Sequence, residues 1–101
     1  MAITTLTETL AADGDSAEIQ WSGQTLGNFS AEGTFGGGTA KLQWSQDGGT
    51  TWKDVDAVDL AFTDTGAGNF FLPACKLRVN LAGATAPSVT ARIMPVEAQS
   101  I

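Results

Sequence analysis

The densest acidic stretch of the chain is the first place where its side chains could do chemistry, and it holds Asp54, Asp56, Asp59 and Asp64. Closely spaced carboxylates suggest calcium, which binds oxygen ligands. An EF-hand loop that begins at Asp54 would need glycine at its sixth position and glutamate at its twelfth, where this chain has Asp59 and Thr65. We therefore predict a solvated strand face and loop here, and likewise at the turn Asp13-Gly14-Asp15.

The chain contains no histidine, which excludes a Ser-His-Asp triad, a Cys-His pair and a histidine-ligated metal. Two carboxylates could cleave a glycosidic bond, but they need a cleft that holds the sugar between them. The run Gly36-Gly37-Gly38 lacks the lysine and the following helix that would cradle a phosphate group. We expect no enzymatic activity, no cofactor and no metal.

Three tryptophans, Trp21, Trp44 and Trp52, could stack on sugar rings. Trp21 and Trp44 are in phase with apolar neighbours, which predicts burial. Trp52 is placed to fold back over its own turn. A sugar platform is the less favoured interpretation of all three.

The segment from Ser45 to Trp52 lies between two strand-like runs and predicts a β-hairpin. Gly48-Gly49 supply the positive φ that tight turns need, and the side chains of Ser45 and Asp47 can bond nearby backbone amides. The pattern Ser-x-Asp-x-Gly-x-Thr-Trp resembles the Asp-box of sialidases and other β-propellers, and it is carried by Ser45, Asp47, Gly49, Thr51 and Trp52. This resemblance implies a structural turn, because Asp-boxes lie away from the catalytic centre and a propeller needs about four to eight blades.

Composition narrows the function classes further. A net charge of −6 with scattered bases disfavours direct binding to nucleic acid, whose affinity for proteins comes largely from lysine and arginine. No run approaches the ~20 apolar residues of a membrane span, and nothing in the first residues predicts export. The single cysteine, Cys75, lies in an apolar context that predicts a buried thiol.

The elements that must position these residues are strands. Glycines punctuate the whole chain, and no ten-residue window has sustained helical spacing of apolar residues. Alternation predicts eight short strands at about Ile3–Thr9, Ala17–Trp21, Phe29–Phe35, Thr39–Trp44, Thr51–Val55, Asn69–Leu72, Lys76–Leu81 and Val89–Met94. This pattern predicts one all-β domain over residues 1–101, a compact antiparallel β-sandwich in which a jelly-roll topology is one option.

The apolar faces of these strands predict the core. Its predicted members are Ala17, Ile19, Trp21, Phe29, Ala31, Phe35, Leu42, Trp44, Leu77, Val79, Leu81, Val89, Ala91 and Ile93.

Two segments, Gly33–Trp52 and Leu72–Thr85, resemble small virion proteins of tailed bacteriophages and together cover about a third of the chain. Within that group, an acidic one-domain sandwich of this size is similar to capsid decoration or cement proteins. The resemblance implies a location on the outer capsid surface, assembly in the host cytoplasm, the major capsid protein as partner, and a homo-oligomer with a trimer favoured. It implies no catalytic residue.

The leading alternative is a tail- or fibre-associated module that binds a host glycan through its loops. Exposed tryptophan beside polar loop residues would favour that module, whereas an apolar surface formed by the chain ends would favour assembly. The candidate docking residues at the two ends are Ile3, Leu6, Leu10, Ile93, Met94, Val96 and Ile101. They could equally belong to ordinary strands within the domain.

Overall fold

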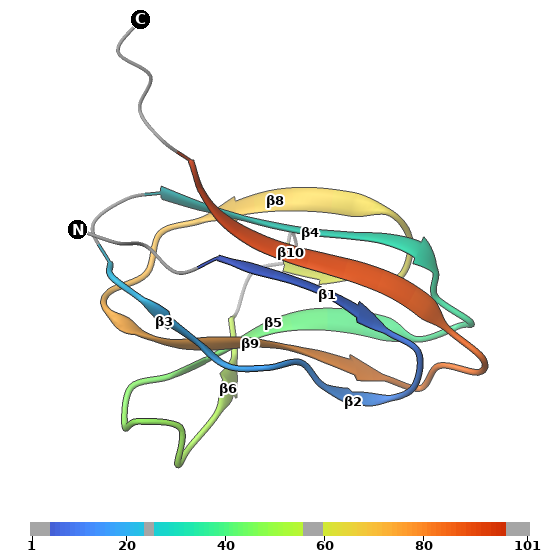
Figure 1. The fold of residues 1–101 in the computed structure, drawn as a ribbon, viewed down its shortest axis with the longest axis horizontal. Coiled ribbons are helices and arrows are strands. Elements are labelled where there is room, and N and C mark those ends of the chain that lie inside the picture. The colour runs from blue at the N-terminus through green and yellow to red at the C-terminus, as the bar shows by residue number, and fades with distance from the viewer. Residues whose placement is uncertain (1–4, 24–25, 56–59, 97–101) are drawn as a thin grey trace, which may run out of the picture.

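The structure, a computed structural model, describes residues 5–23, 26–55 and 60–96, which form two antiparallel sheets packed face to face (Figure 1). Sheet A has the strand order β1 (Leu6–Leu10), β10 (Ser88–Val96), β4 (Leu26–Thr34) and β8 (Gly66–Phe70). Sheet B has β9 (Cys75–Ala82) and β5 (Thr39–Ser45) at its centre. Beside β9 lie β2 (Gly14–Asp15) and β3 (Ile19–Trp21), and beside β5 lie β6 (Lys53–Asp54) and β7 (Ala61–Phe62).

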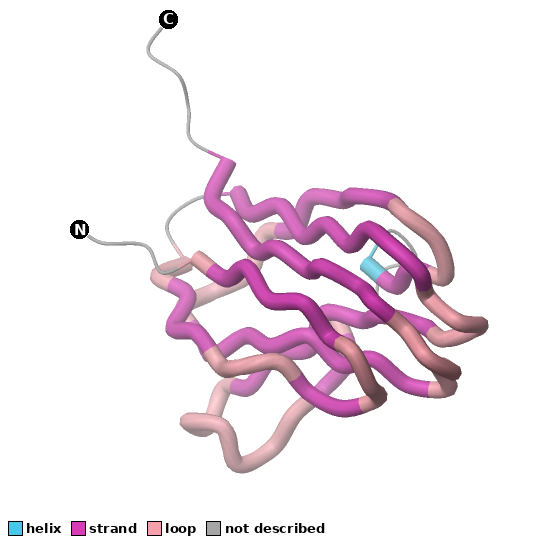
Figure 2. The backbone as a smooth tube through the Cα atoms, turned by 45° about the vertical axis from the view of Figure 1, so that its right-hand side comes forward, coloured by secondary structure: helices cyan, strands magenta, loops and turns pink. Residues whose placement is uncertain are grey.

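The all-β sandwich predicted from the sequence is confirmed, and strands dominate the described chain (Figure 2). No helix among the described residues is long and apolar enough to cross a membrane. Each of the eight predicted strands overlaps an observed one, and β2 and β7 are additional two-residue strands. β2 and β3 can be counted as one interrupted strand, and so can β6 and β7. The strand order is then compatible with a jelly roll, and the jelly-roll topology stays a prediction.

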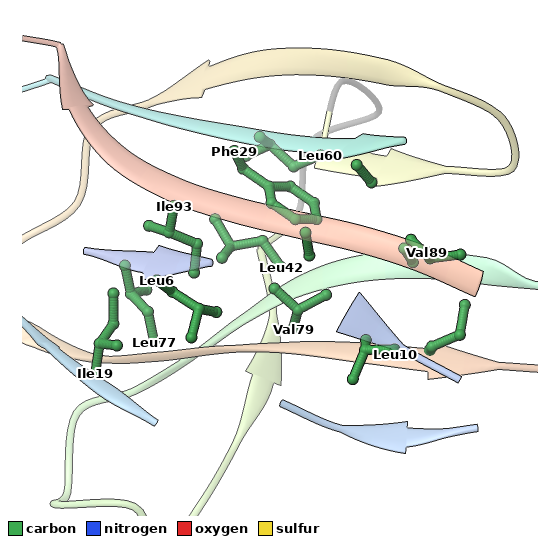
Figure 3. Close-up of a cluster of buried hydrophobic side chains, with 14 of the residues drawn as sticks. Leu6, Leu10, Ile19, Phe29, Leu42, Leu60, Leu77, Val79, Val89 and Ile93 are labelled. Carbon is green, nitrogen blue, oxygen red and sulfur yellow. The ribbon is translucent and has the colours of Figure 1, made fainter. Parts of the chain in front are cut away.

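The core lies between the sheets, where side chains from sheet A meet side chains from sheet B (Figure 3). Phe29, Val89 and Ile93 of sheet A and Leu42 and Val79 of sheet B are fully buried. Most predicted core residues are buried, with two exceptions. Ala17 is exposed, and Trp44 is only half-buried at the core's margin. The list of predicted core residues missed Leu6, Leu10, Ala40, Leu60 and Phe70, whereas Cys75 is buried as its apolar context predicts.

The strand register determines which residues lie together at one end of sheet A, where β10 and β8 end and β4 begins. Val96 is opposite Leu26, and Phe70 is opposite Gly27. The ring of Phe70 covers Gly27 so closely that a Cβ there would overlap it, and it packs on Trp21 with ring centroids 5.0 Å apart. Because neighbouring residues of a strand face opposite sides, Phe70 turns inward and Phe71 turns outward.

Candidate functional site

The hairpin after β5 is held by the side chains that the Asp-box resemblance identified. The Ser45 hydroxyl donates to Asp47 Oδ1 over 2.7 Å and accepts from the Gly49 amide over 2.9 Å. The same Asp47 oxygen accepts from the Thr51 amide over 2.8 Å. Trp52 Nε1 donates to the Gly49 carbonyl over 3.1 Å, and Gly48 and Gly49 have the predicted positive φ. The polar side chains of Ser45, Asp47 and Trp52 thus each have a partner inside the turn.

Hydrogen bonds also favour the ionised form of the Asp47 carboxylate in this turn. The bond from the Thr51 amide, followed by that from the Ser45 hydroxyl, lowers the pKa of Asp47 from 3.8 to about 2. A carboxylate stabilised in this way is a weak base at neutral pH, so it suits a structural role better than proton transfer.

A polar ladder covers the outer face of sheet B beside the hairpin. Arg78 lies over the Trp52 ring at 4.2 Å from its centroid. It also donates from Nε to Gln43 Oε1 over 2.8 Å and pairs through Nη1 with Asp15 Oδ2 at 3.2 Å. Gln43 in turn donates to Asp54 Oδ1 over 2.8 Å. The polar groups of Asp15, Gln43, Asp54 and Arg78 come from four different strands and are joined by these hydrogen bonds and this ion pair.

The described aspartates of the acidic stretch that suggested calcium bind different hydrogen-bond donors. The bond from Gln43, with Lys41 nearby, lowers the pKa of Asp54. Asp64 accepts from the amide of Thr65 over 2.8 Å, and Asp56 and Asp59 lie outside the described residues. Among the residues that the structure describes, no three metal-ligating side chains come together.

The tryptophans are placed largely as the sequence predicts. Trp21 is fully buried, and Trp44 packs against the core with Lys53 Nζ 5.9 Å from its ring centroid. Trp52 is half-buried against Arg78. Cys75 is buried as predicted, and this burial raises the pKa of its thiol to about 11, which makes the thiol unreactive at neutral pH.

The predicted docking residues separate into three groups. Leu6, Leu10 and Ile93 lie in the core, because they occupy the inward positions of β1 and β10. For these three residues, the structure agrees with the alternative of ordinary strands within the domain. Met94 and Val96, at the end of β10, are exposed. Ile3 and Ile101 lie outside the described residues.

Met94 and Val96 have two exposed apolar neighbours that sequence reasoning missed, Leu26 and Phe71. Leu26 is opposite Val96 in the sheet, and Phe71 directly follows β8 with 74% of its surface exposed. These are the four exposed large hydrophobic residues of the described chain, and the register gathers them at one end of sheet A (Figure 1). We call Leu26, Phe71, Met94 and Val96 the end patch.

The rest of the outer face of sheet A is polar and almost uncharged. Thr9 and Thr90 share a hydrogen bond of 3.0 Å between their hydroxyls, and Asn28 donates to Asn69 over 2.9 Å. The charged residues at the outward positions of these strands are Arg92 and Glu32, which pair at 3.2 Å. The end patch therefore adjoins a surface without excess charge.

The sequence contains only weak signals that Phe71 and Leu26 belong to an exposed apolar surface. The adjacent Phe70 and Phe71 end a strand, so alternation requires one ring to face out. Leu26 was missed because that strand was predicted to begin at Phe29, whereas β4 begins at Leu26.

Comparison of the chain with protein-family models, with curated proteins and with solved structures gave no match.

Proposed function

We propose that this chain is a non-enzymatic decoration, or cement, protein of a tailed-phage capsid. In this role it binds the outer face of the assembled head as a homo-oligomer and stabilises contacts between major capsid subunits. The end patch is the observation that carries the proposal. It is an apolar surface at the end where β10 finishes, set beside a polar face whose charges are paired. Such a surface suits a protein partner better than nucleic acid.

The size of the end patch fits a contact that works in many copies. Its four side chains expose roughly 300 Å², near the lower end of the largest apolar patches on monomers. At about 25 cal/mol per Å², its burial contributes about 8 kcal/mol, against an association cost of about 4–15 kcal/mol. One patch therefore binds weakly. Binding that is specific to the assembled shell still stabilises it by mass action, and an oligomer adds avidity.

The glycan-binding alternative has less support. It requires a tryptophan that offers an open face beside polar groups, but Trp21 is buried and Arg78 lies on Trp52. The polar side chains next to Trp52 bond one another instead of remaining available to sugar hydroxyls.

Two variants distinguish these functions in a sedimentation assay with capsids that lack the protein. The double variant Leu26→Thr/Met94→Thr removes apolar area from two exposed strand positions with a residue that strands accept. We expect it to stay folded and to remain in the supernatant under conditions that pellet the wild type with capsids. The matched variant Trp52→Ala, on the other sheet, should pellet as the wild type does. Loss of binding in Trp52→Ala with full binding of the double variant would reverse the assignment.

A further inference from the structure

The four sheet edges of this sandwich differ in how they are protected against pairing with another chain. An open edge presents unpaired amide and carbonyl groups, and proteins usually blunt it with short strands, charges, proline or bulges. In sheet B, one edge is divided into β2 and β3 and the other into β6 and β7, and β6 consists of Lys53 and Asp54. In sheet A, the edge strand β1 contains Glu8, whose carboxylate accepts from the amide of Ala17 over 2.9 Å.

The edge strand β8 lacks these devices. It runs without interruption over Gly66–Phe70, and none of its residues is charged or proline. Its one partner among the described strands is β4. Ala67 and Asn69 point to the exposed outer face, and Phe71 directly follows the strand with its ring in solvent. The strand thus lacks the charges, proline and interruption that would block pairing with another extended segment.

We propose that β8 pairs antiparallel with β8 of a second copy of this chain, about a two-fold axis at Gly68. The strand suits its own copy, because Ala67 and Asn69, which flank Gly68, are uncharged and no charge lies on either partner. Two chains that each carry −6 can meet here without opposing like charges. In this register Ala67 is opposite Asn69 of the partner subunit, and Phe71 lies opposite Thr65 of the partner subunit.

This pairing rests on the proposed function in one respect: it is the contact between subunits of the homo-oligomer proposed above. A two-fold contact is isologous and closes as a dimer. It therefore predicts a dimer in place of the trimer that the phage resemblance favours. Its test needs no capsid, so its failure would leave capsid binding to be judged separately.

The test is a concentration series in sedimentation velocity with two double variants at the same exposed positions. Ala67→Asp/Asn69→Asp places like charges directly opposite across the axis, twice, and Ala67→Lys/Asn69→Asp places opposite charges there. In both variants the carboxylate introduced in place of Asn69 can still accept the hydrogen bond from Asn28. We expect a wild-type dimer, a roughly tenfold weaker dimer for the like-charge variant, and wild-type or tighter association for the opposite-charge variant.

Three results would overturn the pairing. They are a wild-type trimer, a wild-type monomer at all accessible concentrations, and equal dissociation constants for the two charge variants. Circular dichroism of each variant checks that the sandwich is retained.

Discussion

At the scale of single residues, the Ser45 hydroxyl and the Asp47 carboxylate accept hydrogen bonds from backbone amides of the long turn between β5 and β6. One hydroxyl serves Asp47 and Gly49, and one carboxylate oxygen serves Thr51. Ser45 is 2% exposed, so its own hydroxyl is shielded from water and is held to these partners inside the turn. These residues were predictable from the sequence, because the turn pattern is local and its bonds span few residues.

Replacement of Ser45 by alanine should lower the free energy of unfolding by about 1–2 kcal/mol, because it leaves the Gly49 amide without an acceptor. Urea denaturation followed by tryptophan fluorescence measures the change. Ser30→Ala, on the outer face of β4, is the control and should change stability by less than about 0.5 kcal/mol. Equal effects of the two substitutions would show that the hydroxyl does not support the turn.

The lowered pKa of Asp47 predicts a pH dependence of stability. The pKa in the folded protein is about 2, against 3.8 ordinarily. The stabilisation from the ionised carboxylate is therefore present above about pH 4 and is lost as the pH falls towards 2. Unfolding free energies between pH 2 and pH 6 should fall more steeply on acidification in the wild type than in Asp47→Asn. Parallel curves would contradict the assignment.

Two serines with buried hydroxyl oxygens should change stability in opposite directions when they are replaced by alanine. Ser22 Oγ is buried and has no hydrogen-bond partner among the residues that the structure describes, so Ser22→Ala should raise the free energy of unfolding by about 1 kcal/mol. Ser16 Oγ accepts from the Val79 amide over 2.8 Å, so Ser16→Ala should lower it by about 1–3 kcal/mol. Thermal unfolding of both variants measures these changes, and a loss of stability in Ser22→Ala would show that its hydroxyl is satisfied in solution.

At the scale of the elements, alternation predicted the strands and most of the core because one face of each sheet is buried. The ends of the strands were harder to predict. Leu26 and Phe71 differ from loop residues only through the pairing of β4 with β10 and β8, and those partners are distant in the sequence. For the same reason the end patch could be predicted only in part, from the C-terminal residues Met94 and Val96.

The contact between β4 and β8 gives a prediction at this scale. Gly27→Ala would push a Cβ into the Phe70 ring, which cannot move freely because it is buried against Trp21. We expect a loss of about 1–3 kcal/mol in urea denaturation. The substitution Phe70→Leu should make Gly27→Ala less harmful, so that the double variant is more stable than the sum of the single changes predicts. Strict additivity would mean that the ring is not the obstacle.

At the scale of the whole molecule, the sandwich keeps distinct surfaces on its two sheets. Sheet B carries the hairpin and the polar ladder, in which the charges are paired. Sheet A carries the end patch and the edge strand β8, whose one partner among the described strands is β4. These two features make sheet A the side through which we propose assembly, with the patch against the capsid and the edge against a second copy.

The most direct test of the proposed function is quantitative co-sedimentation of the purified protein with capsids that lack it. The proposal predicts saturable binding at a fixed number of copies per capsid, and bound capsids should resist heat or dilution better than bare ones. Protein that remains in the supernatant at all concentrations, or that binds without saturation, would contradict the decoration function.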